Sequence, residues 1–162
     1  MNREVEVTPI TAEEFALFQR FIYDLAGIAL TPQKKQLVAT RLYKRLVHHG
    51  LHSYRRYFDL VNSKGQEREK QLLVDLLTTN ETYFFREPFH FDFLTEQVLP
   101  ALRGRPARLW SAACSSGEEV YTLAMVCAEG LGHGDWEVFG SDISQRMLET
   151  ARAGVYPMDR AR

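Results

Sequence analysis

The sequence has little cysteine and no long apolar run. Its two cysteines, Cys114 and Cys127, are too few and wrongly spaced for a zinc site or a disulfide framework, so we expect two reduced thiols and no metal. No apolar stretch approaches the ~20 residues that a helix needs to cross a bilayer. The N-terminus also lacks the apolar core of a signal peptide. These absences predict a cytoplasmic protein without membrane insertion.

An excess of charge of one sign is missing as well. The formal net charge of −1 argues against general electrostatic attachment to nucleic acid or lipid, although it leaves room for a local charged patch. Hydrophobic residues make up 45% of the 162 residues, which is enough for a real core. The length suits one ordinary domain or two small ones.

The first half of the chain predicts four short amphipathic helices. A capping box of Thr11 with Glu14 begins the first helix, and Gly27 ends it. Pro32 begins the second helix, expected over residues 32–49, and Ser53 caps the third, expected over 54–61. The fourth, expected over 67–77, follows a turn at residues 62–65. Four leucines of the last helix are expected to face inward: Leu72, Leu73, Leu76 and Leu77. Together these helices predict a small all-α domain over residues 1–78.

The helix expected over residues 32–49 carries a basic face. Its apolar stripe comprises Val38, Leu42 and Leu46, at helical spacing. The neighbouring face gathers five basic side chains: Lys34, Arg41, Lys44, Arg45 and His48. A solvated charged face is one interpretation, and a docking surface for an acidic partner is the other. No acid on the same helix offsets the basic residues, which favours docking.

An aromatic segment follows the helical half. Three adjacent rings, Tyr83, Phe84 and Phe85, precede Arg86. Because large rings favour burial, we expect this segment beside the core. A further helix is predicted from Pro88 to Leu99, with Pro100 beyond its end.

The second half reads as strand, loop, helix, strand and acid. We expect a buried strand over residues 109–113, a loop of small residues over 114–117 and a helix that opens with Glu118 and Glu119. A second buried strand over 136–141 ends at Asp142. This order is typical of half of a nucleotide-binding α/β domain, in which ligands lie at the carboxyl ends of the strands.

The acids of this half indicate the kind of ligand. Small side chains allow a ligand close to the backbone and to the free N–H groups of the helix start. Glu118 and Glu119 would repel a pyrophosphate and suit a cationic or hydroxyl-bearing ligand, or they simply complement the helix dipole. Asp142 could accept hydrogen bonds from both ribose hydroxyls, or cap the helix at Ser144. The absence of a G-x-G-x-x-G run argues against a nicotinamide-dependent enzyme.

Three segments carry a family likeness. N-E-T-Y-F-F-R-E (80–87), W-S-A-A-C-S-S-G-E-E-V-Y (110–121) and F-G-S-D-I-S…A-R-A-G-V-Y (139–156) resemble three successive motifs of the chemotaxis receptor methyltransferases, the CheR family. The resemblance extends over essentially the whole chain. It implies an α/β fold: a small N-terminal all-α helical domain, 1–78, then the first part of a Rossmann-like S-adenosylmethionine-dependent methyltransferase domain, 79–162.

The resemblance also implies a function and a site. The family methyl-esterifies glutamate side chains on the cytoplasmic helices of chemoreceptors, with S-adenosylmethionine as cofactor and S-adenosylhomocysteine as product. By position, the cofactor-binding residues would be Asn80, Thr82, Arg86, Ala113, Glu119 and Asp142, and Arg86 would be the catalytic one. The receptor-facing residues would be Lys34, Arg41, Lys44 and Arg45.

Two expected strands are few for this domain. A complete methyltransferase sheet has about seven strands, so the resemblance implies a chain truncated after the second strand, and inactivity of the isolated fragment is one expected outcome. Unpaired strand edges invite pairing with another chain, which predicts a possible dimer through the open sheet edge. The alternative function is a non-catalytic signalling module that docks through the basic helix 32–49.

Overall fold

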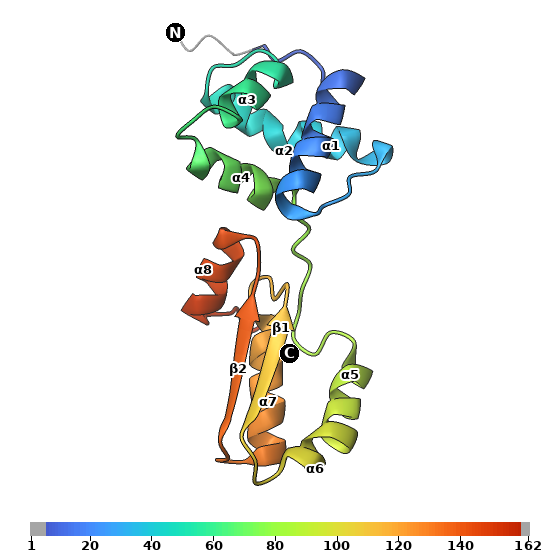
Figure 1. The fold of residues 1–162 in the computed structure, drawn as a ribbon, viewed down its shortest axis with the longest axis vertical. Helices are drawn as coiled ribbons and strands as arrows, with labels where there is room; N and C mark the ends of the chain where they lie inside the picture. Colours follow the sequence, from blue (N-terminus) through green and yellow to red (C-terminus); the bar gives the residue numbers. More distant parts are fainter. Residues whose placement is uncertain (1–5, 160–162) are drawn as a thin grey trace. The chain divides into compact units, whose positions relative to one another are not determined.

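The computed structural model describes residues 6–159 of the chain, shown in Figure 1. The chain divides into two compact units, Met1–Thr78 and Thr79–Arg162. The first unit is all-helical and the second combines helices with a small sheet. An all-α part followed by an α/β part is therefore confirmed.

The first unit contains the expected helices. They are α1 (Ala12–Ala26), the 3₁₀ turn η1 (Pro32–Lys34), α2 (Lys35–His48), α3 (Tyr54–Val61) and α4 (Glu67–Leu77). The capping box at the start of α1 is confirmed, because Glu14 N donates to Thr11 Oγ1 at 3.1 Å and Thr11 N donates to Glu14 Oε2 at 2.9 Å. Gly27 ends α1 with φ 67°, a conformation that glycine adopts without a steric penalty.

The core of the first unit lies where the four helices meet. Its fully buried side chains include Phe18, Ile22, Val38, Leu42, Leu46, Tyr57 and Leu73. The prediction that Leu72 faces inward is wrong, since its side chain is 40% exposed. Glu69, Leu73 and Leu77, spaced four residues apart, form the inward stripe of α4, and Leu72 lies about 100° away from Leu73.

The second unit builds a short parallel sheet. Its elements are α5 (Pro88–Phe93), the π-helical turn η2 (Leu94–Val98), α6 (Leu99–Leu102), β1 (Ala107–Ala112), α7 (Glu118–Leu131), β2 (Trp136–Ser141) and α8 (Gln145–Ala153). The strands β1 and β2 pair in parallel, from Ala107 opposite Trp136 to Ala112 opposite Ser141. Helix α7 crosses behind the sheet in Figure 1.

The helix before the sheet runs past its expected end. Leu99 does not end it, because α6 continues to Leu102 and contains Pro100. A proline inside a helix lacks an N–H donor and its ring crowds the carbonyl four residues earlier. The widened turn η2 lies directly before this position, and such π turns relieve that crowding.

The two faces of the sheet differ. Leu109 and Val138 pack toward α7 in one apolar cluster, whereas Trp110 and Phe139 stack on the opposite face with ring centroids 6.0 Å apart. Trp110 is 62% exposed and Phe139 is 46% exposed. The expectation of two buried strands is therefore wrong, because α7 covers only one face. Among the described residues, no helix is long and apolar enough to cross a membrane.

Candidate functional site

Two loops of the second unit enclose a small hollow. The first loop covers residues 80–87 and the second, residues 113–117, joins the carboxyl end of β1 to α7. The hollow has a volume of about 70 Å³. Its lining residues are Glu81, Thr82, Tyr83, Arg86, Phe91, Ala113, Cys114 and Glu119. It thus lies at the carboxyl end of a parallel strand, where α/β domains place their ligands.

Both loops have a strained backbone. Of the residues described, the non-glycine ones with positive φ are Phe85 (53°), Glu87 (57°), Ala113 (61°) and Ser115 (49°). Such conformations cost about 1–3 kcal/mol each and persist where surrounding contacts hold them, often at ligand sites. No residue type in either loop signals this strain in advance, so sequence reasoning missed it.

The two adjacent glutamates of α7 have different environments. Glu119 lines the hollow and accepts a hydrogen bond from Ser111 Oγ at 2.7 Å. Glu118 is fully buried and accepts one from Ser116 Oγ at 2.6 Å. Glu119 therefore presents a carboxylate to the hollow, while Glu118 helps to fix the second loop.

Asp142 follows β2 and holds two backbone N–H groups. Its Oδ2 accepts from Ser115 N at 2.7 Å and its Oδ1 from Ser144 N at 2.8 Å. The contact with Ser144 is the local capping role that the sequence left open. Each carboxylate oxygen can accept a further hydrogen bond, so a ribose hydroxyl still has acceptors here.

The thiol of Cys114 interacts electrostatically with the carboxylates of Asp142 and Glu119. Burial raises the pKa of its thiol, and the negative charges of Asp142 and Glu119 raise it further. The thiol is therefore protonated at neutral pH, and a thiolate nucleophile is disfavoured. Asp142 contacts this loop at Ser115 N, and Glu119 lines the same hollow as Cys114. Cys127, the second cysteine, is a buried free thiol.

Arg86 is held in a defined orientation at the hollow. Its Nη1 donates to the Glu81 carbonyl at 2.7 Å, and its guanidinium lies 6.0 Å from the centroid of the Tyr83 ring. Asn80 is joined to the second loop, because Ser115 Oγ donates to its carbonyl at 3.3 Å. Thr82, Arg86, Ala113 and Glu119 thus line one hollow, whereas Asn80 and Asp142 do not line it and contact its second loop through Ser115.

The aromatic segment is less buried than expected. Tyr83 is 52% exposed and Phe85 is 45% exposed, so the expectation that these rings are buried beside the core is wrong for both. Tyr83 lies against the guanidinium of Arg86, and Phe85 makes an edge contact with Phe91. These rings line or flank the hollow rather than filling the core.

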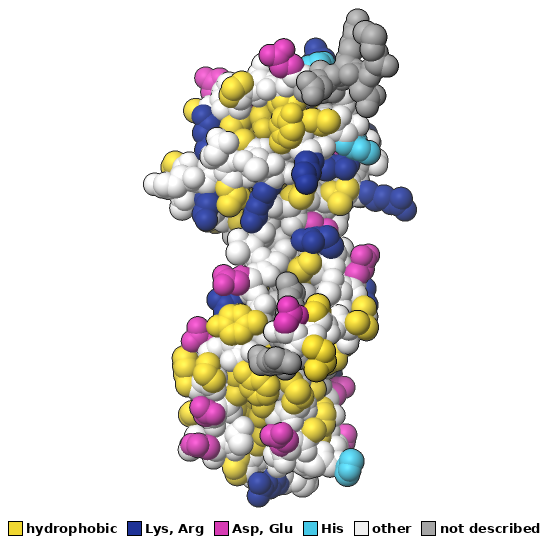
Figure 2. Space-filling view, turned by 180° about the vertical axis from the view of Figure 1, so that it is seen from behind, with side chains coloured by type: hydrophobic (Ala, Val, Ile, Leu, Met, Phe, Trp, Pro, Cys, Tyr) yellow, Lys and Arg dark blue, Asp and Glu magenta, His cyan; other side chains and the backbone are white. Residues whose placement is uncertain are grey.

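The basic face of α2 divides into two parts. Arg45 forms an ion pair with Glu69 of α4 at 2.6 Å, and Arg41 Nη1 donates to the carbonyls of Leu76 (3.0 Å) and Thr78 (2.9 Å). The other two residues expected to face the receptor, Lys34 and Lys44, are exposed. Figure 2 shows Lys and Arg side chains gathered on this unit. The acid that offsets the basic face therefore comes from another helix.

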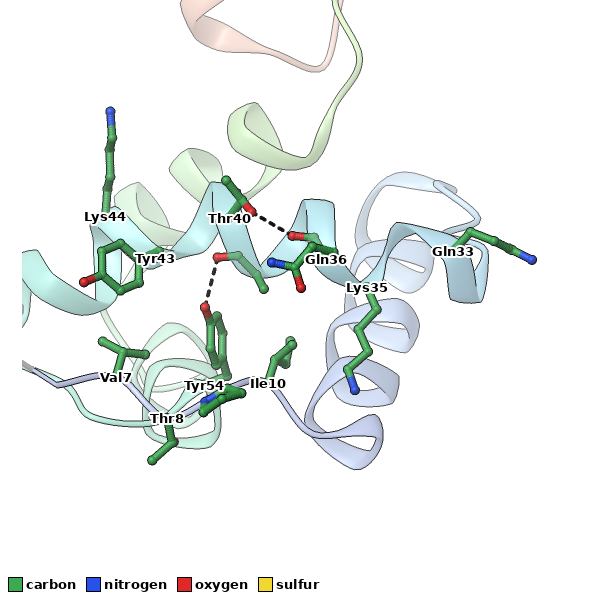
Figure 3. Close-up of a pocket in the computed structure, with 12 residues that line it drawn as sticks. Val7, Thr8, Ile10, Gln33, Lys35, Gln36, Thr40, Tyr43, Lys44 and Tyr54 are labelled. Carbon is green, nitrogen blue, oxygen red and sulfur yellow. Dashed lines mark hydrogen bonds between the residues drawn. The ribbon is translucent and has the colours of Figure 1, made fainter.

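A wider hollow in the first unit lacks comparable chemistry. It lies between residues 7–10 and α2, with a volume of about 780 Å³ (Figure 3). Tyr54 Oη donates to the Ala39 carbonyl at its floor. None of the described residues that line it is Asp, Glu, His or Cys. The smaller hollow, which has acidic, basic and thiol groups, is the better candidate for chemistry.

Comparisons with known proteins agree with this geometry. Residues 80–162 match the family described as "CheR methyltransferase, SAM binding domain", and residues 13–78 match "CheR methyltransferase, all-alpha domain". The chain is 42% identical to a chemotaxis protein methyltransferase of Escherichia coli, over 88% of the chain and 50% of that protein. It is 43% identical to chemotaxis protein methyltransferase 2 of Pseudomonas aeruginosa, over 93% of the chain and 54% of that protein.

These matches fix the family and the extent of the likeness. The chain spans about half the length of the curated relatives it matches. The matched domains follow each other in the order expected from the sequence, and the second is the S-adenosylmethionine-binding domain. The chain therefore belongs to the CheR methyltransferase family.

Proposed function

We propose that S-adenosylmethionine binds at the hollow between loops 80–87 and 113–117, with its amino-acid end inside the hollow, and that the protein methyl-esterifies glutamate side chains on the cytoplasmic helices of chemoreceptors. The observation that carries this proposal is the meeting of Glu119 and Arg86 in one hollow, whose loop is bonded to Asp142. The names of the relatives, chemotaxis protein methyltransferases, support the substrate class. A cytoplasmic location remains part of the proposal.

The residues present fit the charges of this cofactor. Its ammonium group suits the carboxylate of Glu119, which Ser111 holds from the other side. Its carboxylate suits the guanidinium of Arg86, and its ribose hydroxyls suit the remaining acceptor sites of Asp142. When bound, the cofactor supplies a methyl group on a positively charged sulfur. Thr82, Ala113 and Asn80 would add contacts from the two loops.

The protein's catalytic task in this reaction is to position the reactants. A glutamate side chain has an ordinary pKa of about 4.3, so the acceptor is ionised at neutral pH and needs no general base. The protein must orient the acceptor carboxylate and exclude water. Arg86 can orient that carboxylate or hold the cofactor's own carboxylate. The Glu81 carbonyl fixes the guanidinium for either role.

Receptor docking is proposed for the exposed part of the basic face. Lys34 and Lys44 are exposed and available to acidic receptor helices. Arg41 and Arg45 would contribute by holding α2 against α4, in addition to any contact with the receptor. A dimer through the open sheet edge also remains a proposal, supported by the outer edges of β1 and β2, which pair with no other strand among the described residues.

A methyl-transfer assay tests the proposed reaction. The protein is incubated with methyl-labelled S-adenosylmethionine and a receptor cytoplasmic fragment, and alkali-labile label is measured as released methanol. We expect labelling that falls by about tenfold or more in Arg86→Ala, and no labelling of a fragment whose acceptor glutamates are alanine. In a chain extended to the length of the curated relatives, stable binding of the cofactor without label transfer would contradict the proposed reaction.

The non-catalytic alternative makes a different prediction. A signalling module that docks through residues 32–49 is supported by the exposed Lys34 and Lys44. It predicts receptor binding that weakens with salt and persists when no cofactor binding is detected. Competitive binding of S-adenosylhomocysteine would exclude it.

A further inference from the structure

Tyr156 connects the two loops of the hollow without lining it. This residue lies after α8, and its hydroxyl donates to the Ser116 carbonyl at 2.6 Å. Its ring makes an edge contact with Phe84, with centroids 5.0 Å apart. Ser116 belongs to the second loop and Phe84 to the first. One side chain therefore holds both loops that carry the proposed cofactor contacts.

The contact at the second loop is closely packed. A Cβ atom at Gly117 would lie 2.8 Å from Tyr156 Oη and 2.8 Å from Ala151 Cβ. Gly117 also has φ 96°, which other residues rarely adopt. Close packing of this kind leaves the Ser116 carbonyl little freedom to leave the Tyr156 hydroxyl.

The Tyr156 hydroxyl remains a donor under ordinary conditions. Burial raises its pKa to about 12, and the nearby charge of Glu118 adds to the shift. The hydroxyl is therefore protonated across the pH range in which the protein would work.

Thr122 holds the first loop from the side of α7. Its side chain is fully buried, and its Oγ1 accepts from Phe85 N at 3.2 Å while donating to the Glu118 carbonyl at 2.7 Å. Phe85 is one of the strained residues, with φ 53°, and it directly precedes Arg86. Thr122 thus anchors the strained turn that presents Arg86.

We propose that Tyr156 and Thr122 are positioning residues that lock the two loops into one preformed hollow, Tyr156 through Ser116 and Phe84, and Thr122 through Phe85. The proposal deepens the proposed function and rests on it, since the locked hollow is the proposed cofactor site. Neither residue is among those that line the hollow, so each acts through the loops.

Single-atom variants test this lock without requiring a bound ligand. Tyr156→Phe and Thr122→Val each remove a hydroxyl and keep the shape of the side chain. We expect amide hydrogen exchange at the backbone of residues 83–87 and 114–117 to accelerate by about fivefold to tenfold. Exchange in the rest of α7 and in the first unit should stay unchanged.

Matched variants separate positioning from general destabilisation. Tyr121→Phe removes a comparable hydroxyl, which donates to the Ala151 carbonyl at 2.9 Å, and should leave both loops protected. Thr122→Ser restores the hydroxyl and should restore protection. Titration with S-adenosylhomocysteine should show about fivefold weaker binding in Tyr156→Phe and unchanged binding in Tyr121→Phe.

The outcomes distinguish the lock from the proposed function. Unchanged exchange in Tyr156→Phe and Thr122→Val would overturn the lock, whether or not ligand binds. Faster exchange throughout the second unit would also overturn it, because the residues would then be merely structural. If both variants show the local increase in exchange but the wild-type protein does not bind S-adenosylhomocysteine, the lock stands and the proposed cofactor site fails.

Discussion

The two units use a buried acid and an exposed acid in opposite ways. In the first unit, both oxygens of Glu69 are consumed: Oε1 accepts from Arg45 Nε and Tyr57 Oη, each at 2.8 Å, and Oε2 accepts from Arg45 Nη2 at 2.6 Å. In the second unit, Glu119 is held by Ser111 and lines a hollow. A carboxylate saturated by its own chain stabilises the fold, whereas one held from one side is suited to a ligand.

Backbone strain, like the carboxylate available to a ligand, is found in the second unit and not in the described part of the first. Positive φ in the described part of the first unit occurs only at glycines, such as Gly27 and Gly50. The second unit has it at Phe85, Glu87, Ala113 and Ser115, around the hollow. Strain is therefore confined to the unit that the family match identifies as the cofactor-binding domain.

Removing the charge of Glu69 should have the largest effect on stability. Glu69→Gln leaves the Arg45 guanidinium, 21% exposed, without its counter-charge, and loss of one partner from such a pair costs about 3 kcal/mol. Urea unfolding followed by circular dichroism measures the change. The double variant Arg45→Met/Glu69→Leu should recover part of the loss. A cost below about 1 kcal/mol in Glu69→Gln would contradict a structural role.

Acid should remove the same stabilisation. Burial alone would raise the pKa of Glu69, but hydrogen bonds from Arg45, Tyr57 and His49 outweigh it and lower the pKa from 4.5 to about 2. The folded state therefore binds this proton less readily than the unfolded chain. The stabilisation is complete above about pH 4.5 and is lost as the pH falls through about 2.

The acid effect is best measured as a difference between two proteins. The gap in unfolding free energy between wild type and Glu69→Gln, up to about 3 kcal/mol, should narrow from about pH 5 to about pH 2.5. A gap that stays constant over this range would show that Glu69 does not titrate with a lowered pKa.

A glycine substitution should distinguish the packing of the two units. A Cβ atom at Gly140 in β2 would lie 2.6 Å from Val120 Cγ2 and 2.8 Å from Cys114 Sγ, so Gly140→Ala should cost about 2 kcal/mol by overpacking. At Gly27 no atom lies within 4 Å, and Gly27→Ala should cost only the positive-φ penalty, about 1 kcal/mol. Thermal unfolding compares the two. A larger loss at Gly27 would reverse this comparison.

The exposed lysines should have the smallest effect on stability. Lys34→Ala and Lys44→Ala should change the unfolding free energy by less than about 0.5 kcal/mol. Under the proposed function they should weaken binding to a receptor fragment, most strongly at low salt. Receptor binding that is unchanged at low salt would remove these lysines from the proposed docking surface.

Local signals in the sequence predicted the element boundaries well. The Thr11 and Glu14 box and the Gly27 helix end both depend on neighbours within a few residues, and both are present. The π turn before Pro100 was not predicted, because a proline gives the same stop signal whether or not the helix can widen around it.

The site was predicted in part. The motifs named Thr82, Arg86, Ala113 and Glu119 as site residues, and the structure places these four around one hollow. Their role in binding the cofactor stays a prediction. The motifs could not reveal that Arg45 pairs with Glu69, 24 residues away, since that partner is set by helix packing. Helical patterning alone could not reveal which of two adjacent glutamates faces the hollow, because that depends on the rotation of α7, but the resemblance named Glu119, which lines it.

Calorimetric titration with S-adenosylhomocysteine tests the central claim, that Glu119 and Asp142 bind the cofactor, most directly. The heat of binding of S-adenosylhomocysteine is measured for wild type, Glu119→Gln and Asp142→Asn, with Glu137→Gln as a control because Glu137 is an exposed partner of Arg108. We predict binding about tenfold or more weaker in the first two variants, as expected for loss of a charged hydrogen bond, and unchanged binding in the control. Equal affinity for wild type and Glu119→Gln would contradict the proposed site.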